Sequence, residues 1–502
     1  MTKVVNKYKE PYDIYIGRGS KWGNPYSHQS NTKAHYVVAT REEAIAKYKE
    51  YLLNTPELLA DIHELQGKTL GCFCKPKACH GDVLVELVNQ LNPTMEIKPM
   101  KTFNPMQYLA IDIANQFGLD KVTYEERIQW VKDNIDNLEQ LADQAEEPML
   151  YWKAVKALRQ AQNGEATGHT VALDSVCSGL QIMSALMRDK EGCTITGLIH
   201  PDKRYDAYTE VTDTMNELIK NSDEDLGDFF VDRKQSKRAV MTYLYGSKAV
   251  PEEVFGAALL PYFYDAMNIR AKGAMELLGL LHGSWNSDAL AHSWTLPDGH
   301  IAYIPVMQKV EKRIAIKELN YNPVVTMQVN ESKDKGISNI ANVVHSIDAY
   351  VLRTMIRRCN YSKPLVEQFM DMSKSVAYQQ VDKSLKGVQA YLNTQIADIS
   401  VLDAIDHKTI KHYPEQQIQA LRAICEQLLQ HKPFEVIVIH DSFSCSPVNC
   451  NQLRHHYKEI LAELSDSTVI DDILNQLYGD EDTVTKGPSI SYLIRNSSYG
   501  IC

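Results

Sequence analysis

The pattern of apolar and polar positions divides this chain into a short N-terminal part of mixed character and a long part that is mainly helical. Near the N-terminus, the alternation over Tyr12–Ile16 and the apolar run Lys68–Cys74 predict strands. A capping box at Thr40–Glu43 opens a helix, and a second, apolar helix is predicted over Val83–Leu91. Residues 1–92 are therefore expected to form a small α/β domain.

Proline residues separate this domain from the rest of the chain. Pro93, Pro99 and Pro105 predict a linker over residues 93–105. Hairpin-like strands interrupt the following helices only briefly, so residues 106–502 are expected to form one mainly helical α+β region. Amphipathic periodicity predicts its helices at about 106–117, 123–137, 178–189, 205–220, 233–245 and 342–358.

Two predicted strands each deliver an aspartate. A short strand ends at Asp174, and the apolar run Phe434–Ile439, predicted as a buried strand, leads into His440 and Asp441 before Ser442–Cys445 returns as a hairpin. If these strands pair, the two carboxylates meet, and one or two carboxylates with substrate phosphates are a usual Mg²⁺ site. The alternative is that each aspartate serves only as a cap or turn.

One predicted helix carries fixed positive charge. Arg233, Lys237 and Met241 recur every fourth residue and share one stripe, with Tyr245 a further turn along and Gly246 as a stop. Two cations followed by an aromatic ring match the phosphates, sugar and base of a nucleoside triphosphate. The other interpretation is a solvated basic face.

The cysteines cluster once. Cys72, Cys74, Cys79 and His80 are four potential zinc ligands in a short stretch, although their spacing differs from paired Cys-x-x-Cys motifs. The alternative interpretation places Cys72 and Cys74 in the core on one face of a strand.

The composition of the chain argues against a membrane-spanning protein, and its charge distribution shows one basic cluster. With 44% hydrophobic and 23% charged residues, the 502-residue chain is typical of soluble globular proteins, and no apolar run approaches the roughly 18 residues of a membrane span. Ten mostly scattered cysteines favour a reducing cytoplasm. The formal charge of −11 argues mildly against nucleic-acid binding. A basic cluster is nevertheless consistent with a phosphate-binding cleft: Arg233, Lys234, Lys237, Arg238 and Lys248.

Ordered motifs over residues 103–502 resemble those of the phage-type single-subunit DNA-directed RNA polymerases, the family that includes the mitochondrial enzyme. The motifs are Asp174-x-x-Cys-Ser-Gly-x-Gln, Arg233-x3-Lys-x3-Met-Thr-x2-Tyr-Gly, Asn342-Val-Val-His-Ser-Ile-Asp and His440-Asp-Ser-Phe. The resemblance implies a right-hand polymerase with palm and fingers, mostly helical with a small antiparallel palm sheet. It also implies template-dependent nucleotidyl transfer from NTPs with two Mg²⁺ ions.

Carried over to this sequence, the resemblance assigns the phosphate and metal contacts. Asp174 and Asp441 become the two Mg²⁺ ligands. Arg233 and Lys237 contact the triphosphate, and Lys237 protonates the departing pyrophosphate.

The remaining assignments concern the sugar, the base and the RNA end. Tyr245 stacks near the template base and senses the ribose 2′-hydroxyl, and His345 positions the ribose or the minor groove. His440 lies near the RNA 3′ end, and Tyr208 lies near the incoming nucleotide.

The related DNA polymerase family is the main alternative. Gly179 stands where that family usually has a bulky glutamate that blocks the 2′-hydroxyl, and Met241-Thr242 replaces its Phe-Gly. Both departures favour ribonucleotides. A further alternative is a non-catalytic DNA-binding or assembly subunit, against which intact Asp174, Lys237, Tyr245 and Asp441 speak.

The sequence lacks three features that the polymerase family has upstream of the position of Phe103: a large promoter-binding region, a thumb and an Asp-x-x-Gly-Arg type motif. In this it resembles the large catalytic subunit of a two-subunit bacteriophage polymerase. We therefore expect a heterodimer that acts on template DNA, NTPs and nascent RNA in the cytoplasm of an infected bacterial host. The second subunit would supply the promoter contacts, and a single-stranded-DNA-binding helper would assist the melting of duplex DNA. No membrane partner is expected.

Residues 10–91 resemble a different family, a small domain of unknown function. Its marks are Ile16-Gly-Arg-Gly-Ser-x-Trp-Gly-Asn-Pro at the start and Cys72-x-Cys…Cys79-His-Gly at the end. This resemblance implies a domain but no activity.

Overall fold

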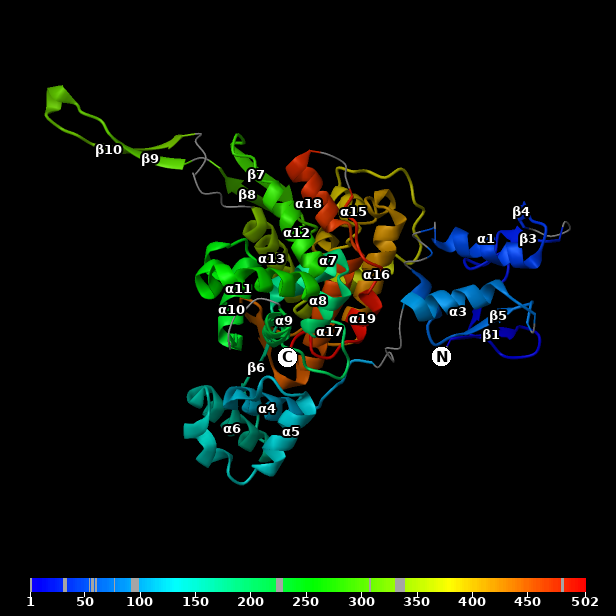
Figure 1. Cartoon of the computed structure of the whole chain (residues 1–502), viewed down its shortest axis with the longest axis horizontal. Helices are drawn as coiled ribbons and strands as arrows, with labels where there is room; N and C mark the ends of the chain where they lie inside the picture. Colours follow the sequence, from blue (N-terminus) through cyan, green and yellow to red (C-terminus); the bar gives the residue numbers. More distant parts are fainter. Residues whose placement is uncertain are drawn as a thin grey trace. The chain divides into compact units, whose positions relative to one another are not determined.

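The structure, a computed structural model, separates into two units, Met1–Ile97 and Lys98–Cys502, each described by itself (Figure 1). It describes residues 2–502 except 30–33, 54, 56–57, 59–60, 76, 92–98, 223–228, 307, 330–338 and 480–482. Residues 93–98 of the predicted linker therefore lie outside the described residues.

The first unit is a small parallel sheet packed with two helices. The sheet has the order β1-β5-β2, and both strand pairs are parallel. The Thr40 hydroxyl accepts a hydrogen bond from the Glu43 N–H at 3.0 Å, as the predicted capping box requires, whereas the Glu43 carboxylate accepts from the Ala39 N–H at 2.9 Å instead of from Thr40. The elements are β1 (Lys3–Asn6), β2 (Ile14–Tyr15), β3 (Tyr26–Ser27), β4 (Tyr36–Val37), α1 (Arg41–Leu53), β5 (Thr69–Cys72) and α3 (His80–Leu91).

The second unit is built around a three-stranded antiparallel sheet with the order β11-β12-β6. These strands are short: β6 covers Val171–Asp174, β11 covers Ile437–Ile439 and β12 covers Ser442–Cys445. The two strands predicted to lead to the aspartates, β6 and β11, thus lie in one sheet, but they do not pair with each other, because β12 lies between them.

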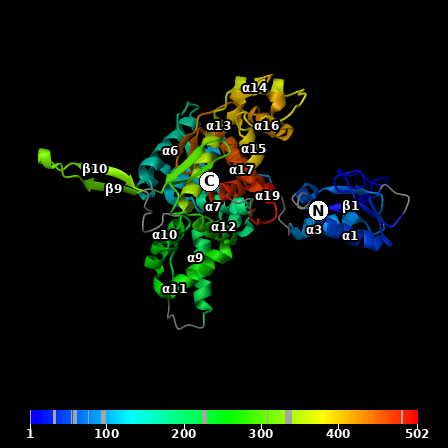
Figure 2. The same cartoon turned by 90° about the horizontal axis from the view of Figure 1, so that it is seen from above.

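Helices form most of the second unit (Figure 2), and α4 and α17 pack against the sheet. The first part contains α4 (Pro105–Ala114), α5 (Tyr124–Asp133), α6 (Pro148–Gln162), α7 (Ser178–Met187), α8 (Lys190–Ile195), α9 (Ala207–Lys220), α10 (Arg233–Tyr243), α11 (Ala249–Arg270) and α12 (Lys272–Gly283). The second part contains α13 (Asn339–Cys359), α14 (Lys363–Met372), α15 (Val388–Thr394), α16 (Glu415–Leu428), α17 (Cys450–Asp466), α18 (Val469–Tyr478) and α19 (Ser491–Asn496).

Packing gives the second unit one large core and one smaller core. In the large core, every residue of α7 is buried, and α7 packs against α12, α13 and α17. The smaller core lies among α14, α15 and α16 and includes Phe369, Val388 and Leu421. The helices α9, α10 and α11 pack on one another as a separate group (Figure 2).

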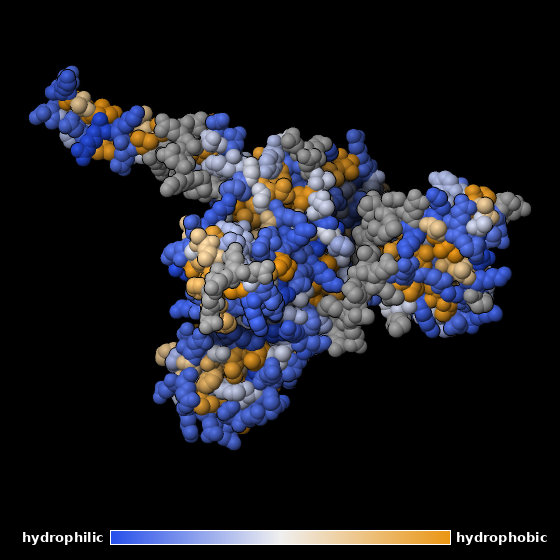
Figure 3. Space-filling model, viewed as in Figure 1, coloured by the Kyte–Doolittle hydropathy of each residue, from blue (hydrophilic) through white to orange (hydrophobic). Residues whose placement is uncertain are grey.

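Two antiparallel ribbons connect α12 to α13. The predicted hairpin after Trp294 is present as β7 (Ala291–Thr295) and β8 (Ile301–Pro305). The longer ribbon of β9 (Gln308–Arg313) and β10 (Val324–Val329) mixes polar and apolar side chains on its surface (Figure 3).

Two predictions from periodicity are wrong in detail. The run Phe434–Ile439 is predicted as a buried strand, but β11 is short, and Ile437 and Ile439 are 55% and 66% exposed. The reason is that β11 is the edge strand of its sheet, a position that an apolar run cannot reveal. Tyr245 is predicted on the helical stripe of Arg233, but α10 ends at Tyr243 and Tyr245 lies in the following turn.

None of the helices in the described part of the chain combines the length and apolarity that a membrane-spanning segment needs.

A buried ion pair joins α13 to α17 behind the sheet. Arg358 is 1% exposed, and its Nη1 and Nη2 donate to the two Glu463 carboxylate oxygens at 2.9 and 2.5 Å. Because Arg358→Met leaves Glu463 without its partner, we expect the free energy of unfolding to fall by about 3 kcal/mol. Denaturant titration measures this change.

The double variant Arg358→Met/Glu463→Met should recover most of the loss, since neither charge then remains. The matched surface pair is Lys374–Asp371, whose side chains are 69% and 75% exposed. Asp371→Ala should leave the denaturation midpoint nearly unchanged, because solvent screens this exposed pair. Equal losses for Arg358→Met and Asp371→Ala would contradict the buried-pair argument.

Candidate active site

The register of the β6–β12 pair sets the two predicted aspartates side by side. Asp174, the last residue of β6, stands opposite Ser442, the first residue of β12, which Asp441 directly precedes. The Ser175 N–H donates to the Asp441 carbonyl at 3.2 Å, and the Ser175 hydroxyl donates to Asp441 Oδ2 at 2.8 Å. Asp174 is exposed and Asp441 is half-buried, so solvent reaches both residues.

The backbone is strained beside both aspartates. Cys177 and His440 have φ values of 61° and 54°, and they are two of the five non-glycine residues with positive φ in the described chain. His440 and Asp441 form the two-residue connection between β11 and β12, because Ile439 pairs with Ser442. Left-handed backbone costs a non-glycine residue about 1–2 kcal/mol. Strain of this kind gathers at functional sites.

A third carboxylate adds to the negative charge of this region. Burial and the Asp441 carboxylate raise the pKa of Asp348 to about 6, against the opposing effect of His440. Burial and the charge of His440 lower the pKa of His345, three residues earlier on α13. The sequence places His345 and Asp348 near one helix face, and the structure brings them to the end of the sheet that carries Asp441.

Two cations of α10 share one aromatic neighbour. Asp232 caps this helix by accepting from the Gln235 N–H. The Tyr208 ring centroid lies 5.5 Å from Arg233 Cζ and 5.7 Å from Lys237 Nζ, within the range of cation–π attraction. The three side chains therefore form one group, which we call the α10 cation group.

The two cations differ in their pairing. Arg233 Nε and Nη2 both lie 2.6 Å from Asp206 Oδ2. Burial acts to raise the pKa of Asp206, but the Arg233 guanidinium outweighs it, and the pKa is lowered. Lys237 is exposed, and its ammonium has no carboxylate partner among the described residues. Lys237 is thus the cation that is free to meet an anionic ligand.

Tyr245 fills the space above a glycine. Its ring stacks on His345 with centroids 4.5 Å apart and planes 4° from parallel. A Cβ added at Gly179 would lie 3.0 Å from Tyr245 Oη and 3.3 Å from its Cζ, so a larger residue requires the ring to shift by a few tenths of an ångström. Burial and the neighbouring Cys177 raise the pKa of Tyr245 to about 12. Gly246 has a φ of 91° and forms the turn after α10.

The supporting roles of several residues near the site were not predicted from the sequence. Ser175 orients Asp441, and its only signal was adjacency to Asp174. Gln181 Nε2 donates to the Gly500 carbonyl at 2.7 Å, and the Tyr457 hydroxyl donates to Gln181 Oε1 at 2.6 Å.

The segment that Gln181 holds lies against the end of β6. The Cys502 N–H donates to the Asp174 carbonyl at 2.9 Å, and Ser175 bridges to Ile501. No local pattern places the last residues of the sequence beside Asp174, because this contact joins segments that are far apart in the chain.

The donor set fits hard cations. Asp174, Asp441 and Asp348 offer carboxylate oxygens, the ligand type that Mg²⁺ prefers. The Ser175 hydrogen bond fixes one of these carboxylates while solvent still reaches it. The described structure therefore gathers the carboxylates, the α10 cation group and the Tyr245–His345 stack around the end of β6 and β12.

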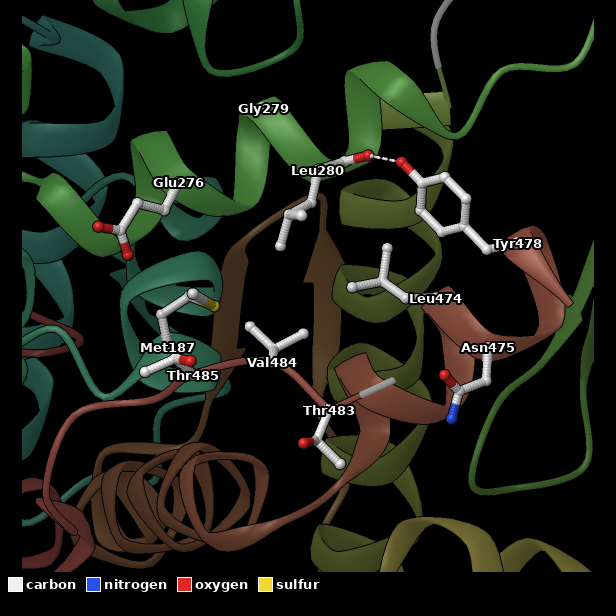
Figure 4. A pocket seen from close by; sticks show the side chains of 10 residues that line it. All are labelled: Met187, Glu276, Gly279, Leu280, Leu474, Asn475, Tyr478, Thr483, Val484 and Thr485. Carbon is white, nitrogen blue, oxygen red and sulfur yellow. Dashed lines mark hydrogen bonds between the residues drawn. The ribbon is translucent and has the colours of Figure 1, made fainter. Parts of the chain in front are cut away.

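Two other features of the chain stand apart from these residues. Cys72, Cys74, Cys79 and His80 belong to the first unit, where their ligand atoms lie within 4.8 Å of one another. A cavity of about 690 Å³ in the second unit lies among α7, α12, α18 and residues 483–485, where the Tyr478 hydroxyl donates to the Leu280 carbonyl at 2.6 Å (Figure 4). It contains none of the predicted site residues.

Known protein families match the two units of the chain separately. Residues 2–90 match the family described as Domain of unknown function (DUF4326). The "Uncharacterized 12.4 kDa protein in nrdA-td intergenic region" of Enterobacteria phage T4 is 35% identical over 91 residues, which are 18% of this chain and 81% of that protein. The N-terminal unit belongs to this family.

Residues 101–253 match the family described as DNA-dependent RNA polymerase. The DNA-directed RNA polymerase of Enterobacteria phage K11 is 26% identical over 345 residues, which cover 50% of this chain and 38% of that protein. The mitochondrial DNA-directed RNA polymerase 1 of Arabidopsis thaliana is 29% identical over 170 residues, which cover 28% of this chain and 17% of that protein.

Residues 101–253 thus match the DNA-dependent RNA polymerase family model, and phage and mitochondrial enzymes are among the relatives that this chain resembles. The resemblance that the motifs indicate is thereby confirmed. The chain spans less than two fifths of the length of either polymerase, 38% and 17%.

The contact between Gly179 and Tyr245 generates a test of packing. Gly179→Ala adds a methyl group that the Tyr245 ring must yield to, so we expect a loss of about 1–3 kcal/mol in the free energy of unfolding. Gly279→Ala is the matched control, because Gly279 is also helical and nothing lies within 4 Å of its added Cβ. That variant should gain about 0.5–1 kcal/mol from lower backbone entropy in the unfolded state.

Removing the hydroxyl should relieve part of the clash. In denaturant titrations, the double variant Gly179→Ala/Tyr245→Phe is expected to be more stable than Gly179→Ala alone. Equal stability of Gly179→Ala and Gly279→Ala would show that Tyr245 does not fill this space.

Proposed function

We propose that this chain is the catalytic subunit of a DNA-directed RNA polymerase, which transfers nucleotides from NTPs to RNA on a DNA template. The observation that carries the proposal is the β6–β12 register, which sets Asp174 beside Asp441. The family match of residues 101–253 supports the same reaction. In this assignment the β11-β12-β6 sheet is the palm, and α9, α10 and α11 are part of the fingers.

Asp174 and Asp441 would hold two Mg²⁺ ions. Bound there, the ions supply charge that activates the RNA 3′ hydroxyl and stabilises the leaving pyrophosphate. Ser175 keeps Asp441 in place through its 2.8 Å hydrogen bond. His440 lies next to Asp441 on the strained turn, in a position to meet the RNA 3′ end.

The α10 cation group would receive the triphosphate. Lys237 contacts the β- and γ-phosphates and donates a proton to the departing pyrophosphate, since its ammonium has no carboxylate partner among the residues described. Arg233 is held by Asp206 at 2.6 Å, which fixes its guanidinium beside Tyr208. Preorganised charges of this kind stabilise charge that develops in the transition state.

Tyr245 and His345 would contact the base and the sugar. Their parallel rings form a flat surface against which a template base stacks, and the Tyr245 hydroxyl is close to the ribose 2′-hydroxyl. Gly179 is central to this arrangement, because an added Cβ would lie only 3.0 Å from the Tyr245 hydroxyl oxygen. A site that accommodates the 2′-hydroxyl in this way accepts ribonucleotides.

The enzyme that we propose is a heterodimer. The edge strand β11 exposes Ile437 and Ile439 by 55% and 66%, and β11 pairs only with β12 among the described strands. Such an edge is a ready template for another chain. The partner would contribute promoter contacts, and a single-stranded-DNA-binding helper would assist melting in the cytoplasm of an infected bacterium.

Synthesis on single-stranded DNA tests this proposal directly. With Mg²⁺ and the partner subunit encoded by the same genome, we expect RNA from NTPs and little product from dNTPs. Asp441→Asn keeps the shape but removes the charge, so the rate should fall at least about 100-fold. Asp371→Asn, an exposed carboxylate on α14, is the control that should retain full activity.

Three other outcomes would change the proposal. Preference for dNTPs would favour a DNA polymerase. Promoter-specific RNA from the purified chain alone would refute the heterodimer. No product in any arm, with every variant folded, would refute the polymerase function.

Lys237 has a matched control on the same helix. We expect Lys237→Ala to lower kcat in RNA synthesis by about 100-fold, because the pyrophosphate loses its counter-charge and proton donor. Arg238→Ala should leave kcat unchanged, since Arg238 pairs with Glu253 at 2.9 Å instead. Equal kcat for the two variants would remove Lys237 from the mechanism.

A further inference from the structure

The first unit gathers three thiols and one imidazole at the end of β5. Cys72 Sγ lies 3.7 Å from Cys74 Sγ and 4.0 Å from His80 Nδ1, and Cys79 Sγ lies 3.8 Å from the same nitrogen. All four ligand atoms lie within 4.8 Å of one another. Thiolates about 2.3 Å from a tetrahedral zinc ion stand about 3.8 Å apart, so the spacing matches a zinc site.

The tautomer of His80 is set for metal binding. Its Nε2 lies 2.8 Å from the Ile16 carbonyl, an acceptor, so Nε2 carries the proton and donates. The lone pair of Nδ1 is therefore left facing Cys72 and Cys79. Histidines that bind metals usually donate their other N–H to a carbonyl or carboxylate in this way.

The sulfur atoms are also oriented. The Gly81 N–H donates to Cys79 Sγ at 3.3 Å, which fixes the position of this sulfur. The 3.7 Å separation of Cys72 and Cys74 is far from the roughly 2.05 Å of a disulfide bond. Cys72, Cys79 and His80 are buried and Cys74 is half-buried, so the four side chains face inward together.

The local fold explains how an unusual spacing reaches this geometry. Cys72 ends β5, the chain reverses after Cys74, and Cys79 and His80 sit where α3 begins. The Lys77 N–H donates to the Cys74 carbonyl at 2.9 Å within this reversal. The loop thus returns the second ligand pair to the first.

We propose that Cys72, Cys74, Cys79 and His80 bind one Zn²⁺ ion. Four protein ligands fill a tetrahedral shell and leave no open position, so the ion is structural. It would tie β5 to α3 and, through His80, to Ile16 after β2. Small domains with limited cores commonly gain stability from such an ion. The proposal does not rest on RNA synthesis, because all four ligands belong to the first unit.

Metal analysis of the full chain tests this site. The chain is purified under reducing conditions without chelators, and elemental analysis should find one zinc per chain. Cys74→Ser and Cys79→Ser should each lose most of it. The control Cys425→Ala removes a buried cysteine from α16 of the other unit and should retain the zinc.

The absorption spectrum of bound Co²⁺ reports which atoms bind the metal, and not only whether the chain is folded. Co²⁺ added to the metal-free chain should show tetrahedral d–d absorption and sulfur-to-metal charge transfer, and His80→Cys should strengthen the charge-transfer band by about a third, from three thiolates to four. Three results would overturn the proposal. They are a purified chain that contains no zinc, Cys74→Ser and Cys79→Ser variants that each keep as much zinc as the unaltered chain, and a chain that shows an iron–sulfur chromophore instead of zinc.

Discussion

The register between β6 and β12 is the constraint on which the second unit depends. Side chains alternate between the two faces of a strand, so a slip of one residue would turn Asp174 away from Asp441. The antiparallel pairing of Phe443 with Leu173 and of Cys445 with Val171 places apolar, buried residues on the core side. Core burial and the meeting of the carboxylates are therefore set by the same register.

The buried helix α7 connects the β6–β12 pair to the aromatic residues of the site. Cys177 precedes it, with a left-handed backbone between β6 and the helix, and the second helical residue, Gly179, lies under Tyr245. Tyr245 in turn stacks on His345 of α13. The distance from the carboxylates to the flat aromatic surface is thus fixed by packed groups, which gives the site its shape before any ligand arrives.

Many of the secondary-structure elements and candidate site residues could be predicted from the sequence, because capping boxes, apolar periodicity and motif spacing are properties of neighbouring residues. The helix start at Thr40 and the β11–β12 hairpin follow from such signals. Burial of β11 and the Arg233–Asp206 pair do not, since they depend on which distant segment lies alongside. The thiol cluster is similar: its spacing argued against zinc, but the reversal between Cys74 and Cys79 brings the ligands together.

The two units differ in the kind of metal ion that they can hold. Thiolates and imidazole select soft or borderline ions such as Zn²⁺, whereas carboxylates exposed to water suit Mg²⁺. Asp174 and Asp441 therefore compete little with the cluster at Cys72 for the same ion. A zinc site closed by four protein ligands also exchanges slowly, which keeps a tight-binding ion out of the carboxylate site. With the proposed Zn²⁺ at the cysteine cluster and Mg²⁺ at the aspartates, ligand chemistry would direct each ion to its own site.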